Sequence, residues 1–305
     1  RQRQMCIRDS KYPDVEWDWE NINTKDMYFP KNFIWGTATA AHQVEGFNTN
    51  NNWYRWEHSF DQNGKSRIHN SDKSGDAADH WNLYKQDINL MKNIGVNAYR
   101  FSVEWSKIMP KINKIDQDAI DHYRAVCIAL IDSGLVPVVT LHHFTHPLWF
   151  EDLGGFEKEE NIKYFLEFSE LIFNELSDIV KYWCTINEPA VYVSQGYFNG
   201  VFPPGKKDPL LAGEVMKNLL YAHTEVYHLL KSLKNGDQSQ IGLVKNMKPL
   251  IGVIFDFNND DIFIGDNINK LARLNNEDIK VSDIQNRTDG CLLYTSPSPR
   301  DGHQS

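Results

Sequence analysis

Short runs of apolar, β-favouring residues alternate along this 305-residue chain with longer segments in which apolar residues recur every three or four positions. The first pattern is typical of buried strands and the second of amphipathic helices. The predicted strands are residues 33–38, 97–103, 136–142, 182–186 and 241–244. The predicted helices centre on residues 81–91, 120–130, 162–179 and 215–229. This alternation predicts about five successive β/α units.

The third predicted strand, residues 136–142, is nearly all apolar until its end. Such a run indicates a strand that is covered on both faces, as parallel strands are. Beyond residue 249 the pattern weakens, because residues 251–257 could form another strand but residues 268–274 support only a short helix. The whole pattern favours one α/β domain, either an open doubly wound sheet or a (β/α)8 barrel.

Polar residues at the predicted strand ends distinguish these two folds. The chain has no Gly-x-Gly-x-x-Gly or P-loop segment, which an open sheet usually places at its ligand site. A barrel instead gathers polar residues from the carboxyl ends of several strands around one opening. The residues in such positions are Gln43, Arg100, His142, His143, Asn187 and Glu188. We therefore predict an α/β fold of the (β/α)8 (TIM) barrel type.

The segment from Tyr182 to Pro189 is the first candidate for chemistry. Its apolar residues are followed directly by an amide, a carboxylate and a proline, at Asn187, Glu188 and Pro189. A proline disfavours helical geometry at the residue before it, so we expect Glu188 to lie on extended backbone. Alone, an Asn-Glu-Pro tripeptide would more often be a solvated strand end, and its meaning therefore depends on the rest of the chain.

The net charge of −9 gives no electrostatic footprint for nucleic acid, and we expect no nucleic-acid partner. No apolar run approaches the roughly 18 residues that a membrane helix needs. The N-terminal residues also lack the apolar segment of a signal peptide. We therefore expect a cytoplasmic protein without membrane association, whose oligomeric state the sequence does not indicate.

The four cysteines are too scattered for zinc ligand spacing and too few for a disulfide scaffold. We expect Cys127 and Cys184 to lie in the core. Metal binding by His142, His143 and His146 is disfavoured, because adjacent strand histidines point to opposite faces and no supporting carboxylate motif follows. We therefore expect neither a metal nor another cofactor.

Both ends of the chain differ from its interior. Residues 1–10 and 290–305 match no interior pattern and look like translated adaptor or vector sequence, with natural disordered tails as the alternative. We therefore expect one partial barrel domain at residues 11–289, flanked by two non-native tails. On this interpretation the natural protein extends past residue 289.

Four stretches of the sequence occur in the order and at the spacing of a known enzyme family. They are Phe-Ile-Trp-Gly-Thr-Ala-Thr-Ala-Ala-His-Gln-Val-Glu-Gly at 33–46, Tyr-Arg-Phe-Ser-Val-Glu-Trp-Ser at 99–106, Thr-Leu-His-His-Phe at 140–144 and Thr-Ile-Asn-Glu-Pro at 185–189. In these stretches the chain resembles glycoside hydrolase family 1, the β-glucosidase and β-galactosidase family of (β/α)8 barrels. The resemblance extends over about residues 29–244, and it implies a β-linked oligosaccharide or glycoside as the substrate.

The resemblance implies roles for five residues. Gln43 and His143 match residues that hydrogen-bond hydroxyls of the cleaved sugar. Asn187 matches the asparagine that contacts the sugar 2-hydroxyl. Glu188 matches the general acid/base, and Arg100 matches the arginine beside the nucleophile.

Two neighbouring positions depart from the family pattern. His142 stands where the family more often has Tyr, and Phe144 where it often has Trp. The resemblance therefore implies a stacking surface that differs from that of other members.

A retaining glycosidase needs two carboxyl groups, an acid with a raised pKa and a nucleophile roughly 5–5.5 Å away. The family's nucleophile lies in an Ile/Val-Thr-Glu-Asn-Gly segment at its seventh strand, and no such segment follows residue 244 here. Glu214, Glu225 and Glu277 lie in helix or loop contexts and are poor substitutes. The resemblance thus implies a retaining β-glycosidase of which this chain, inactive alone, covers about the first five β/α units. The alternative is a non-catalytic carbohydrate-binding or interaction module derived from such an enzyme.

Overall fold

The computed structural model describes residues 28–246, 252–256, 261–265 and 292–293. The chain divides into two units, residues 1–34 and residues 35–305. In the described part of the first unit, the Phe33 amide donates to the Pro30 carbonyl oxygen at 2.9 Å. The rings of Phe29 and Phe33 lie 4.8 Å apart, between centroids. The predicted adaptor-like tails lie outside the described residues, apart from the two residues 292–293.

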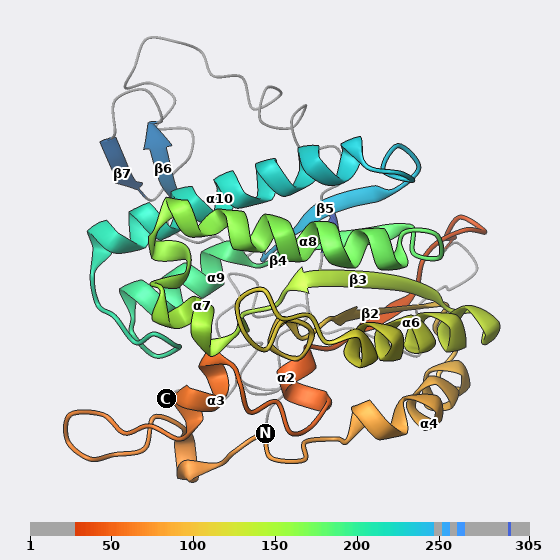
Figure 1. The fold of residues 1–305 in the computed structure, drawn as a ribbon, viewed down its shortest axis with the longest axis horizontal. Coiled ribbons are helices and arrows are strands. Elements are labelled where there is room, and N and C mark those ends of the chain that lie inside the picture. Colours follow the sequence, from red (N-terminus) through yellow and green to blue (C-terminus); the bar gives the residue numbers. More distant parts are fainter. Residues whose placement is uncertain (1–27, 247–251, 257–260, 266–291, 294–305) are drawn as a thin grey trace, which may run out of the picture. The chain divides into compact units, whose positions relative to one another are not determined.

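The second unit contains a parallel sheet in which neighbouring strands follow chain order, β1-β2-β3-β4-β5-β8 (Figure 1). Its strands are β1 Gly36–Ala38, β2 Ala98–Ser102, β3 Val136–His142, β4 Tyr182–Asn187, β5 Gln240–Lys245 and β8 Leu292–Leu293. The five predicted strands are thereby confirmed, although β1 is shorter than expected. An incomplete (β/α) barrel has this arrangement, because its parallel strands add in sequence with a helix after each.

A separate antiparallel pair follows β5 in the chain. It consists of β6 Gly252–Asp256 and β7 Asp261–Gly265, with Gly252 opposite Gly265. The possible strand predicted at residues 251–257 corresponds to β6. The short helix predicted at residues 268–274 lies outside the described residues.

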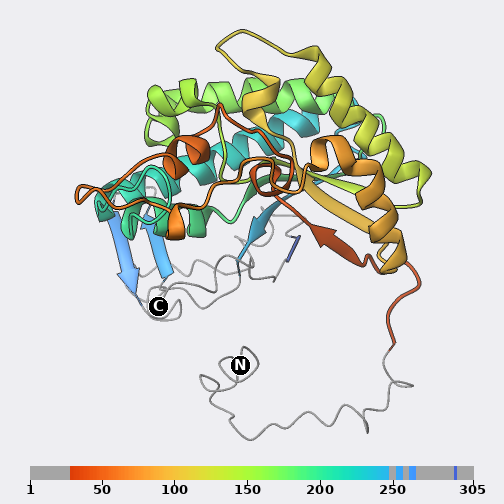
Figure 2. The ribbon, with the colours of Figure 1, turned by 90° about the horizontal axis from the view of Figure 1, so that it is seen from below.

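Four long helices follow the first four strands and lie on one side of the sheet (Figure 2). They are α4 His80–Asn93, α6 Gln117–Asp132, α8 Ile162–Leu176 and α10 Pro209–Ser232. Shorter helical segments occupy the connections: α2 Ala41–Val44, α3 Asn52–Glu57, η2 His69–Ser71, α5 Trp105–Ile108, α7 Leu148–Asp152, η3 Gly155–Glu157, η4 Glu159–Asn161, α9 Pro189–Val193 and the π-helical η5 Ser194–Phe198. All four long helices correspond to predicted ones.

Local sequence fixes where these helices begin and end. Helix α6 begins after Asp116, whose side chain accepts a hydrogen bond from the Ala119 amide at 3.2 Å, and a glycine with positive φ, Gly134, follows its end. Helix α10 has proline at its first position and is capped by Asp208, which accepts from the amides of Leu210 and Leu211. These caps satisfy amide groups that have no partner inside a helix.

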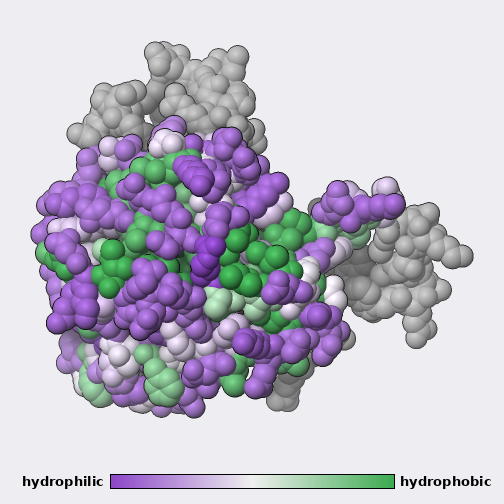
Figure 3. Space-filling model, turned by 45° about the vertical axis from the view of Figure 1, so that its right-hand side comes forward, coloured by the Kyte–Doolittle hydropathy of each residue, from purple (hydrophilic) through white to green (hydrophobic). Residues whose placement is uncertain are grey.

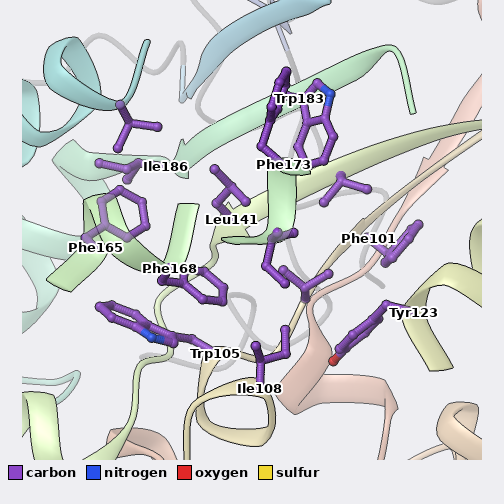
Figure 4. Packing of buried hydrophobic residues seen from close by; sticks show 14 of the residues in the cluster. Phe101, Trp105, Ile108, Tyr123, Leu141, Phe165, Phe168, Phe173, Trp183 and Ile186 are labelled. Atoms are coloured by element: carbon purple, nitrogen blue, oxygen red, sulfur yellow. The ribbon is translucent and has the colours of Figure 1, made fainter. Parts of the chain in front are cut away.

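The main hydrophobic core lies between the sheet and the long helices (Figure 4). Trp183 of β4 packs against Phe173 of α8, with ring centroids 5.0 Å apart, and Leu141 of β3 belongs to the same buried cluster as Phe165 and Phe168 of α8. Trp105 stacks on Phe168 with ring centroids 4.9 Å apart. A second, small cluster consists of Val138, Cys184 and Val244, with Tyr182 packed against it. We call these the outer core and the inner cluster.

Both cysteines among the described residues, Cys127 and Cys184, are buried in the core, as predicted. The face shown in Figure 3 is mostly hydrophilic, with hydrophobic residues in several patches between hydrophilic ones. Exposed large apolar side chains include Leu90, Ile94 and Leu210. Within the described ranges, no helix is both long and apolar enough to cross a membrane.

Candidate active site

The carboxyl ends of β2, β3 and β4 bring together three of the predicted site residues. Arg100 lies in β2, His143 directly after β3, and Asn187 at the end of β4. One terminal guanidinium nitrogen of Arg100 donates to Asn187 Oδ1 and lies 3.5 Å from His143 Nδ1. These side chains come from three different strands, as the barrel prediction required. We call them the Arg100 cluster.

Arg100 is 8% exposed, so its charge has been largely removed from water. A buried cation is tolerated only when its N–H groups find partners. Its Nε donates to Thr140 Oγ1 at 2.9 Å, and Thr140 itself is completely buried. Sequence reasoning did not single out Thr140. The available signal was a hydroxyl residue inside an otherwise apolar strand, which needs a hydrogen-bond partner when buried.

Glu188 lies at the junction between β4 and α9, and the prediction of extended backbone there was wrong. Its φ of 44° and ψ of 61° are left-handed, and it is the N-terminal cap residue of α9. The Glu188 amide donates to the Val244 carbonyl oxygen at 2.8 Å, while its own carbonyl accepts from Tyr192 at 3.0 Å. Proline disfavours the right-handed helical region at Glu188, but the chain must still turn from strand into helix, and the left-handed region allows that turn.

This backbone conformation is costly for a residue with a Cβ atom, by roughly 1–3 kcal/mol, and such costs gather at functional sites. The register between β4 and β5 also shifts between Cys184 and Asn187. Irregularities of this kind redirect side chains at the end of a strand. The Glu188 side chain, which is half-buried, therefore leaves the sheet next to Asn187 instead of continuing the strand.

His142 and His143 lie on opposite sides of the chain, as predicted for adjacent strand residues. His142 is completely buried and packs edge-on against Phe156 and Tyr192, with ring centroids 5.1 and 5.6 Å away. His143 is half-buried beside Arg100. Burial is the main cause that lowers the pKa of both imidazoles well below the ordinary value, followed by His146 for His142 and by the positive Arg100 for His143. Both rings are therefore neutral at pH 7.

Gln43, the remaining predicted substrate contact, lies in α2 with an exposed side chain. In the described part of the chain it makes no hydrogen bond with the Arg100 cluster. Its role in the site stays a prediction. The described residues also contain no group of three or more His, Cys, Asp or Glu side chains placed to hold a metal ion.

Three half-buried aromatic residues from different connections form a row that begins beside His143. The Phe144 ring lies 5.2 Å from the His143 ring and 6.0 Å from that of Phe202, which in turn lies 4.9 Å from Trp53. Phe202 follows α9, and sequence reasoning did not identify it. Aromatic faces of this kind can pack against the apolar faces of sugar rings.

Known proteins share this sequence and fold. Residues 25–262 match the model of Glycosyl hydrolase family 1. Beta-glucosidase A of Acetivibrio thermocellus is 39% identical over 72% of this chain and 49% of its own length, and Beta-glucosidase A of Thermotoga maritima is 34% identical over the same shares. The chain thus spans about half the length of the curated relatives it matches.

Solved structures agree with the sequence comparisons. The beta-glycosidase from Pyrococcus horikoshii is 44% identical, with a TM-score of 0.65 over 76% of this chain and 51% of that one. The beta-glucosidase from Thermotoga maritima in complex with castanospermine is 33% identical, with a TM-score of 0.67 over 72% of this chain and 49% of that one. By sequence and by fold, this chain belongs to glycosyl hydrolase family 1.

Proposed function

We propose that this chain is the acid/base half of a retaining β-glycosidase that hydrolyses β-glucosides or related β-linked sugars. The observation that carries the proposal is the position of Glu188. It is the N-terminal cap residue of α9 and directly follows Asn187, which accepts a hydrogen bond from Arg100. One carboxyl group, two sugar-binding candidates, His143 and Asn187, and Arg100 thus gather at the carboxyl ends of consecutive parallel strands. In a (β/α)8 barrel this is the end at which catalysis occurs.

The proposed chemistry assigns Glu188 the proton transfers. As an acid it protonates the glycosidic oxygen while a second carboxylate attacks the anomeric carbon, and the bond to the leaving group breaks. As a base it then takes a proton from water, which attacks the same carbon and releases the second carboxylate. Asn187 would bind the sugar 2-hydroxyl, and Arg100 would place positive charge beside the nucleophile.

The second carboxylate is the component for which this sequence offers no candidate. It contains no Thr-Glu-Asn-Gly-like segment, and both Glu214 and Glu225 lie in α10, on the helical layer. We therefore expect the purified chain to show no turnover of an aryl β-glucoside. Robust hydrolysis that disappears in the Glu188→Gln variant would contradict this expectation.

A longer reading frame that contains these residues provides the decisive test. We expect it to encode a Thr-Glu-Asn-Gly-like segment and to hydrolyse aryl β-glucosides with retention of configuration. Glu188→Gln should then lower turnover by about 10²- to 10⁴-fold, the usual contribution of general acid–base catalysis. Glu225→Gln is the matched control and should change turnover little, since Glu225 lies on α10.

A reading frame that ends without a second carboxylate would count against the proposal. In that case a folded chain that binds glucosides without cleaving them would instead identify a carbohydrate-binding module. Isothermal titration with a non-hydrolysable thioglucoside separates this outcome from a chain that neither binds nor cleaves.

A further inference from the structure

We propose that Thr140 is a positioning residue that orients the guanidinium of Arg100. The oriented guanidinium in turn directs N–H donors of His143 and Asn187 toward the bound glycoside. The inference deepens the proposed function and rests on it. It concerns a strand residue that the proposed chemistry does not use. The bond from Arg100 Nε to Thr140 Oγ1, at 2.9 Å, is its starting point.

Thr140 is held rigidly. It lies inside β3, paired with Ser102 of β2 and Cys184 of β4, and it is completely buried. A threonine in a strand has few χ1 choices, so the position of its hydroxyl is largely set by the backbone. The sheet thereby supplies a fixed acceptor for the guanidinium of Arg100.

A fixed Nε determines where the rest of the guanidinium points. The group is planar, with five N–H donors in a rigid fork, so anchoring one nitrogen restricts rotation of the whole plane. In this orientation a terminal nitrogen faces both Asn187 Oδ1 and His143 Nδ1. Without the Thr140 hydroxyl, the plane could turn to seek another acceptor for Nε, because a buried N–H without a partner is costly.

The chemistry of the guanidinium then fixes its two neighbours. Arginine has no acceptor atom, so the Asn187 atom that faces it must be the amide oxygen, and the Asn187 NH₂ group is directed elsewhere. By the same reasoning, His143 Nδ1 must present a lone pair to Arg100. A neutral imidazole carries one proton, which for His143 therefore resides on Nε2.

The candidate site therefore offers hydrogen-bond donors to a ligand. The Asn187 NH₂ group and His143 Nε2–H both seek acceptors, and the hydroxyl oxygens of a sugar have lone pairs to accept them. A change at Thr140 would thus alter ligand recognition without touching the ligand. A purely structural role for Thr140 would change stability but leave the position of the His143 proton unaltered.

The experiment compares Thr140→Val, which removes the hydroxyl at nearly constant shape, with Thr140→Ser, which restores it. Each chain is labelled with ¹⁵N-histidine, and the tautomer of His143 is determined by NMR at neutral pH. We expect the Nε2–H signature in the wild type and in Thr140→Ser. We expect Thr140→Val to lose it in favour of a mixture of tautomers.

Thr185→Val is the matched control, since Thr185 is also completely buried, in β4, and its hydroxyl bonds to His223 Nδ1 at 2.7 Å. That variant should alter the signals of His223 and leave those of His143 unchanged. An unchanged His143 tautomer in a folded Thr140→Val chain would overturn the proposal. Should Thr140→Val fail to fold, Thr140→Ala, which also lacks the hydroxyl and leaves the Arg100 guanidinium in place, decides the question by the same criterion.

The tautomer measurement needs no turnover, so it can fail independently of the proposed function. If Thr140→Val changes the His143 tautomer but the protein proves not to be a glycosidase, only the proposed function is refuted. If the protein is an active glycosidase but Thr140→Val leaves the His143 tautomer unchanged, only the role of Thr140 is refuted. In an active longer chain, Thr140→Val should lower kcat/KM by about 10-fold, an effect that Thr140→Ser rescues.

Discussion

The two faces of the parallel sheet carry different kinds of side chains. Successive residues of β3, which point to opposite faces, show this contrast. On the face toward the helices, Val139 and Leu141 join the outer core together with side chains from α6 and α8. On the other face, Val138 packs within the inner cluster, and the Thr140 hydroxyl accepts a hydrogen bond from Arg100. The outer face therefore stabilises the fold, whereas the inner face positions polar groups.

This division explains how a chain that spans about half of the relatives' length can keep a recognisable fold. The outer core is formed by strands and the helices that follow them, so each β/α unit brings most of its own packing partners. The inner face of a barrel is different, because its side chains are packed against those of strands from around the whole ring. Stability and function thus depend on different parts of the sequence.

The largest expected effect lies in the outer core. Phe168→Ala should lower the free energy of unfolding by about 3–5 kcal/mol, since Phe168 is completely buried and stacks on Trp105. The same substitution at Phe60, which is 65% exposed, should change it by less than about 0.5 kcal/mol. Urea unfolding of both variants measures the difference. Equal losses would mean that the outer core does not carry the stability.

A smaller effect concerns pH and the buried His142. Its pKa lies well below 6.5 in the folded chain, mainly because of burial and then because of His146 and His143. Below pH 6.5 the unfolded chain therefore binds more protons at this site than the folded one, and stability falls as pH falls. One such group changes stability by up to about 1.4 kcal/mol per pH unit. In His142→Phe, this part of the acid sensitivity should disappear.

The surroundings of His142 determine how that experiment is controlled. Its Nε2 lies 3.4 Å from His146 Nδ1, and His146 is bonded through Nε2 to Glu151 at 2.6 Å, so that the histidine–carboxylate pair remains in the variant. Phe60→Leu, which changes an exposed side chain that has no titrating group, is the control and should leave the pH dependence as it is. Unfolding at about pH 7.5 and about pH 5.5 compares the three chains. If His142→Phe and the wild type lose the same free energy of unfolding between these two pH values, His142 is not the source of the acid sensitivity.

The elements of the outer face could be predicted from sequence because they repeat a pattern. Residues 136–142 are nearly all apolar until the end of the run, and the helices bury residues at spacings of three and four, such as Ile120, Tyr123 and Cys127 in α6. Both signals are local and depend on burial alone. Strand order followed as well, since consecutive β/α units add neighbouring strands.

For the candidate site, the sequence predicted residues at strand ends but not how their side chains are connected. Arg100, His143 and Asn187 were placed at strand ends by sequence, and the fold joins them. The anchoring of Arg100 by Thr140 depends on register between β2 and β3, which no local pattern encodes. The left-handed backbone of Glu188 arises where a strand must turn directly into a helix, and a rule about the residue before proline cannot reveal this.

The smallest and sharpest prediction compares neighbours in β3. Val139→Ala should lower the free energy of unfolding by about 2 kcal/mol, the transfer and cavity cost of two buried methyl groups in a close-packed site. Val138→Ala should cost only about 1 kcal/mol, because Val138 is 8% exposed and its small cluster can relax around the lost methyl groups. Urea unfolding resolves this difference when both variants share the wild-type m-value. A larger loss of unfolding free energy in Val138→Ala than in Val139→Ala would contradict the assignment of stability to the outer face. It would mean that the inner face of the sheet also stabilises the fold.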